Sequence, residues 1–275
     1  MALQIKHADY APNWNGKQLS LQAMGNDLYD YVWGGTSAFD FARADLVPNV
    51  IDNGYQFKNL RENAGVATAI SVRQGDGSPA LNSINTDKGL PLYKNQFGNT
   101  SLPSAFELTS HGSTTSAVIH AWVNKKEAQD TGTYTVGICN GAMNSLNTAQ
   151  WIFGQVNGKF SFTVGSNGTG QSINSTEIQP VGEYLLSIFI QKMSSTNFTA
   201  HAYINNTKVG SIDRLYPLNA PNNPKISLSD GSSGLSKAIL RRCGVRVVDP
   251  AVYTVTEHEA WIAEQIAANS SRFSA

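Results

Sequence analysis

The side chains with the clearest chemical potential are aromatic rings and amides of the kind that bind sugars. Sugars are generally held by an aromatic face together with side-chain amides, which both donate and accept hydrogen bonds. Tyr134 and Trp151 supply rings, and Asn140 and Asn144 supply amides. The sequence therefore predicts a carbohydrate-binding site at these four residues, although a position in the core is the favoured alternative for Trp151, as it is for Trp122.

Patterns typical of catalysis are weak by comparison. Hydrolysis of a glycosidic bond with retention needs two carboxyl groups about 5–5.5 Å apart, and Glu107, Glu183 and Asp249 stand isolated in the expected strands. The glycine-rich segment 165–170 follows a strand but opens no helix, so it indicates a hairpin tip rather than a phosphate loop. We predict no enzymatic activity, no catalytic residue and no cofactor.

Metal ligands are equally sparse. His120 and His201 fall in expected strands that could pair, which would allow a metal site or an acid–base pair, or simply two strand histidines with satisfied hydrogen bonds. Calcium needs clustered oxygen ligands, and the loops around Asp130 and Asp230 are the candidates, with ordinary turn chemistry as the favoured alternative. We predict no bound metal.

Composition narrows the classes of partner. Charged residues make up only 15% of the 275 residues and the formal net charge is zero, whereas soluble domains average about 25% charged residues. A surface rich in Asn, Ser, Thr and Gly lacks the clustered Lys and Arg that nucleic acids require, so we expect no nucleic-acid binding. Near-zero net charge also favours self-association.

The two cysteines and the N-terminal residues give little information about function. Cys139 and Cys243 are expected to be two buried free thiols, with a single disulfide between strands as the alternative. Residues 1–7 lack the apolar centre of a signal peptide, and no long apolar run occurs. We therefore expect synthesis in a cytoplasm without export, and no membrane contact.

The elements that must position these residues are mostly β-strands. Alternating or continuous apolar patterns at regular spacing predict the strands 104–108, 116–124, 133–138, 149–154, 158–164, 184–191, 198–204, 225–228 and 238–248. Shorter candidates precede them at 18–21, 29–33 and 69–73. Asn205-Asn206 suits a tight hairpin turn, because Asn tolerates positive φ. One helix is expected after Thr254, with Glu257 at capping-box spacing and a frayed end from Asn269.

This spacing predicts an all-β fold, an antiparallel sandwich of the jelly-roll type with a short C-terminal helix. We expect two parts: an irregular arm or lobe over residues 1–103, and the sandwich with its helix over residues 104–275.

The order of elements over residues 104–268 resembles the concanavalin A-like lectin/glucanase superfamily, especially its laminin-G-like domains. The resemblance rests on a strand with Trp at 117–123, a Glu-Tyr-x-Leu-x-Ile type strand at 182–190, the hairpin 203–210 and the strand-plus-helix junction 246–257. It implies a lectin-like sandwich. The Glu-x-Asp-x-x-Glu motif of the glycosidases with this fold is missing, and Asn206 stands where relatives usually have Gly.

Composition and resemblance together suggest a role in assembly. A β-rich protein without net charge and with a lectin-like domain is similar to bacteriophage virion components of the tail, baseplate or head decoration. We therefore expect a non-enzymatic virion protein that docks to other virion proteins and to copies of itself. A carbohydrate-binding lectin that recognises a surface glycan is the alternative, and a polysaccharide-degrading enzyme is a weaker one.

Overall fold

The computed structural model describes residues 36–43, 46–48, 50–51, 54–60, 65–72, 82–83, 89–91, 97–111, 116–126, 135–140, 149–219, 224–227 and 238–273. Contacts divide the chain into two compact units, 1–33 and 34–275, and every described residue belongs to the second. Its strands and its helix are β1 (Ser37–Asp40), β2 (Val50–Ile51), β3 (Gln56–Phe57), β4 (Ala67–Val72), β5 (Asn82–Ser83), β6 (Leu90–Pro91), β7 (Phe97–Ser101), β8 (Ser116–Lys125), β9 (Thr135–Asn140), β10 (Trp151–Val156), β11 (Lys159–Ser166), β12 (Thr169–Asn174), β13 (Gly182–Lys192), β14 (Asn197–Ile204), β15 (Thr207–Leu215), β16 (Pro224–Ser227), β17 (Ala238–Val248) and α2 (Val255–Phe273).

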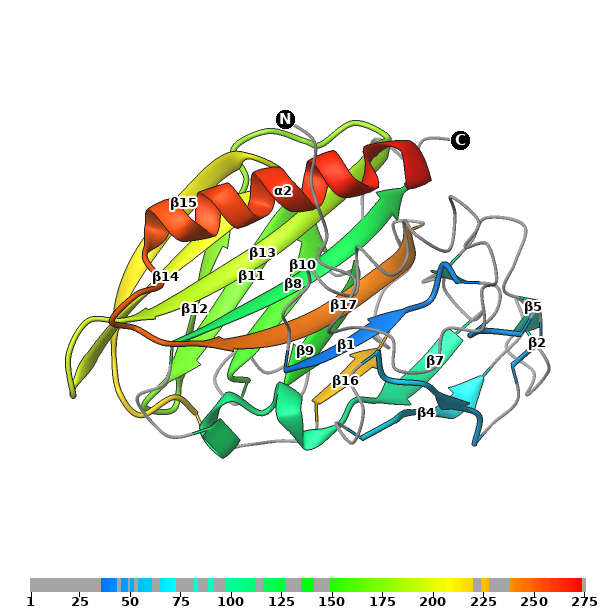
Figure 1. Cartoon of the computed structure of the whole chain (residues 1–275), viewed down its shortest axis with the longest axis horizontal. Helices are drawn as coiled ribbons and strands as arrows, with labels where there is room; N and C mark the ends of the chain where they lie inside the picture. The colour runs from blue at the N-terminus through cyan, green and yellow to red at the C-terminus, as the bar shows by residue number, and fades with distance from the viewer. Residues whose placement is uncertain are drawn as a thin grey trace, which may run out of the picture. The chain divides into compact units, whose positions relative to one another are not determined.

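These strands form two antiparallel sheets and one separate pair. The helix-side sheet has the order β1-β17-β8-β13-β14-β15, with β6 also beside β17. The second sheet has the order β12-β11-β10-β9-β16-β7-β4-β3, and β2 pairs with β5. Figure 1 shows α2 lying across the face of the helix-side sheet. The predicted fold class, an antiparallel β-sandwich with a C-terminal helix, is confirmed.

The core lies between the two sheets and follows the two-residue period of the strands. On β8, Ile119, Ala121 and Val123 belong to the same buried cluster as Trp151 and Phe153 of β10. Alternate side chains of a strand point to opposite faces of its sheet, so this cluster fixes which face of β8 looks inward. The strand expected at 116–124 is present, with Ile119, Ala121 and Val123 on its inner face.

A second apolar cluster covers the outer face of the helix-side sheet. Leu185 and Phe189 of β13 pack there with Trp261 and Ile262 of α2. Because the alternate residues of β13 are buried in the core between the sheets, the strand is apolar on both faces. This explains the nearly continuous apolar sequence of the strand expected at 184–191.

Both ends of α2 are set by polar side chains. At the start, the Thr254 backbone N–H donates to the Glu257 carboxylate at 3.2 Å, and the Glu257 N–H donates to the Thr254 hydroxyl at 3.5 Å. The predicted capping box is therefore present. At the end, the helix does not fray at Asn269 but continues to Phe273. The expectation that the helix frays from Asn269 is therefore wrong, and the reason is that Asn269 is buried and hydrogen-bonded.

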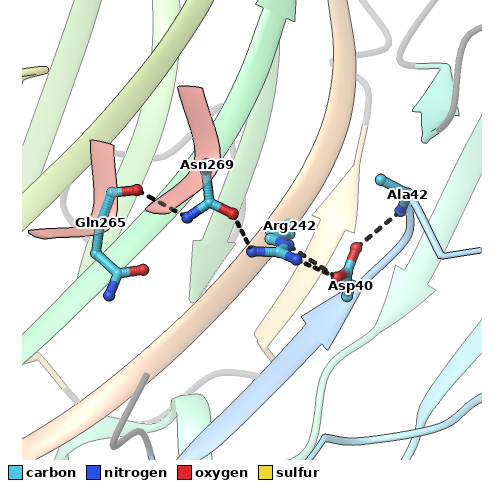
Figure 2. A network of polar contacts seen from close by, with 5 residues as sticks. All are labelled: Asp40, Ala42, Arg242, Gln265 and Asn269. Atoms are coloured by element: carbon cyan, nitrogen blue, oxygen red, sulfur yellow. Dashed lines mark hydrogen bonds and ion pairs between the residues drawn. The ribbon is translucent and has the colours of Figure 1, made fainter. Parts of the chain in front are cut away.

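Asn269 belongs to a buried polar network that joins α2 to two strands (Figure 2). Its side-chain oxygen accepts from Arg242 Nη1 at 2.7 Å, and its amide nitrogen donates to the Gln265 carbonyl at 2.8 Å. Arg242 in turn pairs with Asp40, with Nε at 2.8 Å and Nη2 at 2.6 Å from Oδ2. The other Asp40 oxygen accepts from the Ala42 N–H at 3.0 Å. The network thus connects β1, β17 and the last turns of α2.

Several other expectations need correction or fall outside the described residues. The segment expected as a strand at 104–108 forms two 3₁₀ turns, Ser104–Phe106 and Leu108–His111. The candidate strands 18–21 and 29–33 lie outside the described residues. The proposed division at residue 103 stays a prediction, although β1 pairs with β17 and β7 pairs with β16 across that position.

The first prediction concerns the buried ion pair. Removing one partner of a buried pair leaves the other charge uncompensated, which typically costs about 3–5 kcal/mol. Asp40→Asn is therefore expected to lower the free energy of unfolding by that amount in urea titrations. Asp213→Asn, at an exposed acid that accepts from Thr199, is the matched control. An Asp40→Asn protein as stable as the control would contradict the role of this pair.

Candidate functional site

Of the four predicted sugar-binding residues, the structure describes Trp151 and the backbone of Asn140. Trp151 is 0% exposed, and its indole N–H donates to the Phe106 carbonyl at 3.0 Å. It therefore has no free face for a sugar and occupies the core, as the alternative had it. Asn140 is the last residue of β9, while Tyr134 and Asn144 lie outside the described residues. A site built on these three stays a prediction.

The hairpin between β14 and β15 provides a better candidate. The predicted turn is present, and the left-handed conformation falls on Asn205, whose φ is 51°. Asn205 is tied to β13 by two hydrogen bonds: its N–H donates to the Leu185 carbonyl at 2.7 Å, and its Oδ1 accepts from the Leu185 N–H at 2.8 Å. This attachment holds the exposed Asn206 in place at the tip.

A pocket of about 170 Å³ lies between this tip and α2, lined by Asn206, Glu259, Ile262 and Ala263. We call it the hairpin–helix pocket. Ile262 is buried, whereas the other three residues are exposed. The pocket therefore combines an apolar floor with a carboxylate and a carboxamide at its rim.

Glu259 is held in position by a tyrosine beneath it. The Tyr203 hydroxyl donates to Glu259 Oε1 at 3.1 Å. Burial raises the pKa of Tyr203, and the nearby Glu259 carboxylate raises it further. The phenol consequently stays protonated and keeps donating, so the carboxylate is oriented before any ligand arrives.

Behind the pocket, His258 lies at the centre of the contact between α2 and the sheet. It is 0% exposed. Its Nε2 is 3.1 Å from the Ser187 hydroxyl and its Nδ1 is 3.2 Å from the Tyr253 hydroxyl. Burial lowers the pKa of His258 to about 3, with further lowering by His201 and Arg246. The imidazole is therefore neutral at physiological pH and serves to dock the helix.

The two strand histidines do not form the pair that their strands were expected to allow. β8 and β14 are not neighbours, because β13 lies between them. His201 Nε2 is 3.1 Å from the Gln191 side-chain oxygen, so this nitrogen has a partner on the neighbouring strand of its own sheet. Burial lowers the pKa of His120 well below its usual value and that of His201 to about 4. These are packed, neutral histidines.

The described residues offer few groups for metal binding or thiol chemistry. Within them, no group of three or more His, Cys, Asp or Glu side chains could hold a metal ion, and the calcium candidates Asp130 and Asp230 lie elsewhere. Cys243 is a free buried thiol whose pKa is raised by burial. In the part of the chain that the structure describes, no helix is both long and apolar enough to span a membrane.

Comparisons with known proteins bear on the fold. No family model and no curated protein matches the chain. Among solved structures, it is similar to a botulinum neurotoxin serotype D/C VPI 5993 binding domain, with a TM-score of 0.51 and 10% identity over 85% of this chain. It is also similar to a structure described as a receptor binding domain, with a TM-score of 0.53 and 12% identity over 87% of this chain.

The chain spans only about half the length of these structures, 53% and 52% respectively. At such low identity the likeness shows the β-sandwich fold alone. The sandwich that the concanavalin A-like resemblance implied is therefore present, while membership of that superfamily stays a prediction.

The sequence pointed to the hairpin but not to the pocket. Asn206 is predicted as a turn residue that stands where relatives usually have Gly, and no prediction is attached to Glu259. Their proximity depends on how α2 crosses the sheet, which no local pattern encodes. The one available signal for the pocket was the position of Glu259, an acid one residue after His258 and next to the buried face of the helix.

The second prediction follows from the neutral histidines. His258 titrates near 6.5 when unfolded and near 3 when folded, so the unfolded state takes up protons first as pH falls. Stability is then lost progressively below about pH 6.5, and His258 alone accounts for about 2 kcal/mol between pH 7.5 and 5. Burial raises the pKa of Asp40, which opposes this trend at the acidic end.

Urea unfolding at several pH values measures this slope. His258→Gln, which can keep both hydrogen bonds but cannot ionise, should flatten it, whereas His111→Gln, outside the cluster, should not. Equal slopes for the wild type and His258→Gln would show that this histidine is not buried neutral.

Proposed function

We propose that this protein is a non-enzymatic recognition module that binds carbohydrate at the hairpin–helix pocket. The observation that carries the proposal is the pocket's lining, a carboxylate and a carboxamide placed around an apolar floor. Carboxylate and amide oxygens accept hydrogen bonds from sugar hydroxyls, and the amide also donates. The C–H groups of a sugar ring would pack on Ile262.

The rigidity of the site supports a binding role. Glu259 is oriented by Tyr203 and Asn206 by the attachment of Asn205 to β13. Groups fixed in advance lose little conformational freedom when a ligand binds, so even a small pocket can contribute useful affinity. A volume of about 170 Å³ suits one small group rather than a long chain.

The fold agrees with this proposal by analogy. The two structures compared above are described as a binding domain and a receptor binding domain, not as catalytic units. Fold alone does not determine function; the analogy only favours recognition over catalysis as the kind of role.

Docking within a bacteriophage virion is the second candidate. Met193, Leu215 and Val252 expose 60%, 58% and 68% of their surface at one end of the helix-side sheet. Met193 and Leu215 both flank Asn197, through a backbone hydrogen bond and a strand pairing respectively. Exposed apolar residues gathered in this way are typical of contact surfaces. An assembling virion protein would use such an end for partners or for copies of itself.

The third prediction tests the pocket. Ala263→Trp places a large ring at the rim and should reduce glycan binding at least tenfold by filling the space. Ala268→Trp, at an exposed alanine of the same helix outside the pocket, should bind like the wild type. The labelled proteins are compared on a glycan array, and melting temperatures confirm folding. No glycan above background for the wild type, or equal binding by Ala263→Trp, would overturn the proposal.

The fourth prediction tests docking. The double variant Met193→Ser, Leu215→Ser should shift self-association toward monomer in light scattering coupled to size-exclusion chromatography. Ile178→Ser, Val181→Ser changes two exposed apolar residues that precede the start of β13, at the end away from Met193. A wild-type protein that is monomeric at all concentrations would remove this support for assembly through its own copies.

A further inference from the structure

In the described part of the chain, the one charged residue that lines the hairpin–helix pocket is Glu259, and the helix that carries it is rich in acidic residues. Helix α2 carries Glu257, Glu259 and Glu264 on exposed positions, and its one basic residue, Arg272, lies near its other end. On the hairpin, Lys208 is the cross-strand partner of Tyr203 and is the nearest basic residue along that ribbon. Of these charged groups only Glu259 lines the pocket, so its carboxylate is the charge that a ligand in the pocket would meet.

Within the pocket, Glu259 retains acceptor capacity for a ligand. Among the described residues, its side chain receives one hydrogen bond, from Tyr203 to Oε1. No Lys or Arg of those residues forms an ion pair with it. An ionised carboxyl group offers about four acceptor positions, so most of the acceptor capacity of this pocket-lining residue is open.

We infer that the hairpin–helix pocket selects sugars that carry a free amine over neutral sugars and rejects sugars that carry a carboxylate, with Glu259 as the selecting group. This inference rests on the proposed carbohydrate-binding function and names its ligand class. An ammonium group donates three hydrogen bonds and has no acceptor, which complements a carboxylate whose acceptor positions are open.

The electrostatic argument sets the order of affinities. A hydrogen bond between two charged groups is roughly twice as strong as one between neutral groups, so an amino sugar should gain over its hydroxyl analogue. A carboxylated sugar would bring a second negative charge next to Glu259, and like charges at close distance repel. Asn206 and Ile262 contribute equally to all three classes, because neither is charged.

The experiment compares glucosamine, glucose and glucuronic acid by saturation-transfer NMR and calorimetric titration against the full chain. We expect glucosamine to bind roughly tenfold more tightly than glucose, and glucuronic acid to bind more weakly than either. Glu259→Gln should abolish the preference for the amine while keeping the bond from Tyr203, because Gln retains an acceptor oxygen. Glu264→Gln, at an exposed acid of α2 outside the pocket, should keep the preference.

The outcomes separate the inference from the function it rests on. If all three sugars bind with similar affinity, or if Glu259→Gln keeps the wild-type preference, the selecting role of Glu259 is refuted while carbohydrate binding stands. If no sugar binds the wild type, both fail together. Loss of the preference in Glu264→Gln as well would assign it to the general charge of α2 rather than to Glu259, and would also refute the inference.

Discussion

The structure depends above all on the burial of the outer face of the helix-side sheet by α2. Without the helix, Leu185 and Phe189 of β13 would face water on one side of the sheet while their neighbours fill the core on the other. Burial of large apolar side chains contributes about 1.5–3 kcal/mol each, so this contact is a main source of stability. It requires a neutral His258, since a charged imidazole without a counter-ion is costly at a buried position.

The pocket exists because of this contact. One of its walls is α2 and the other is the β14–β15 tip, so its width is set by how the helix lies on the sheet. His258 and Glu259 are consecutive residues with opposite roles: the first is buried against Ser187 and Tyr253, the second is exposed at the rim. Because consecutive helical residues point in different directions, docking through His258 also aims Glu259 at the hairpin. Stability and recognition therefore share the same turn of helix.

Local patterns in the sequence predicted much of the fold. The strands β8 and β13 and the capping box at Thr254 were predicted correctly, because each depends on near neighbours in the chain. The short strand β1 was missed, since its pairing is decided by a distant partner, β17. The segment 104–108 has strand-like composition, but it forms 3₁₀ turns whose Phe106 carbonyl accepts from Trp151. Trp151 shows why the binding site was harder to predict than the fold. The type of ring suggested a surface for sugar binding, whereas tertiary packing places this ring in the core.

The buried polar residues under α2 are better explained by positional specificity than by net stability. A buried ion pair such as Asp40–Arg242 gains little over apolar residues of the same shape, because both charges lose their hydration. Gln265 is also buried, and neither polar atom of its side chain has a hydrogen-bond partner in the described structure, which costs about 1–3 kcal/mol for each unpaired group. An apolar seam would allow α2 to slide or rotate on the sheet. The hydrogen bond from Arg242 to Asn269 is compatible with only one placement of the last turns of the helix. That placement fixes the position of Ile262 and Ala263 two turns earlier. The buried polar residues therefore lower stability at Gln265, and in return they give the pocket a defined shape.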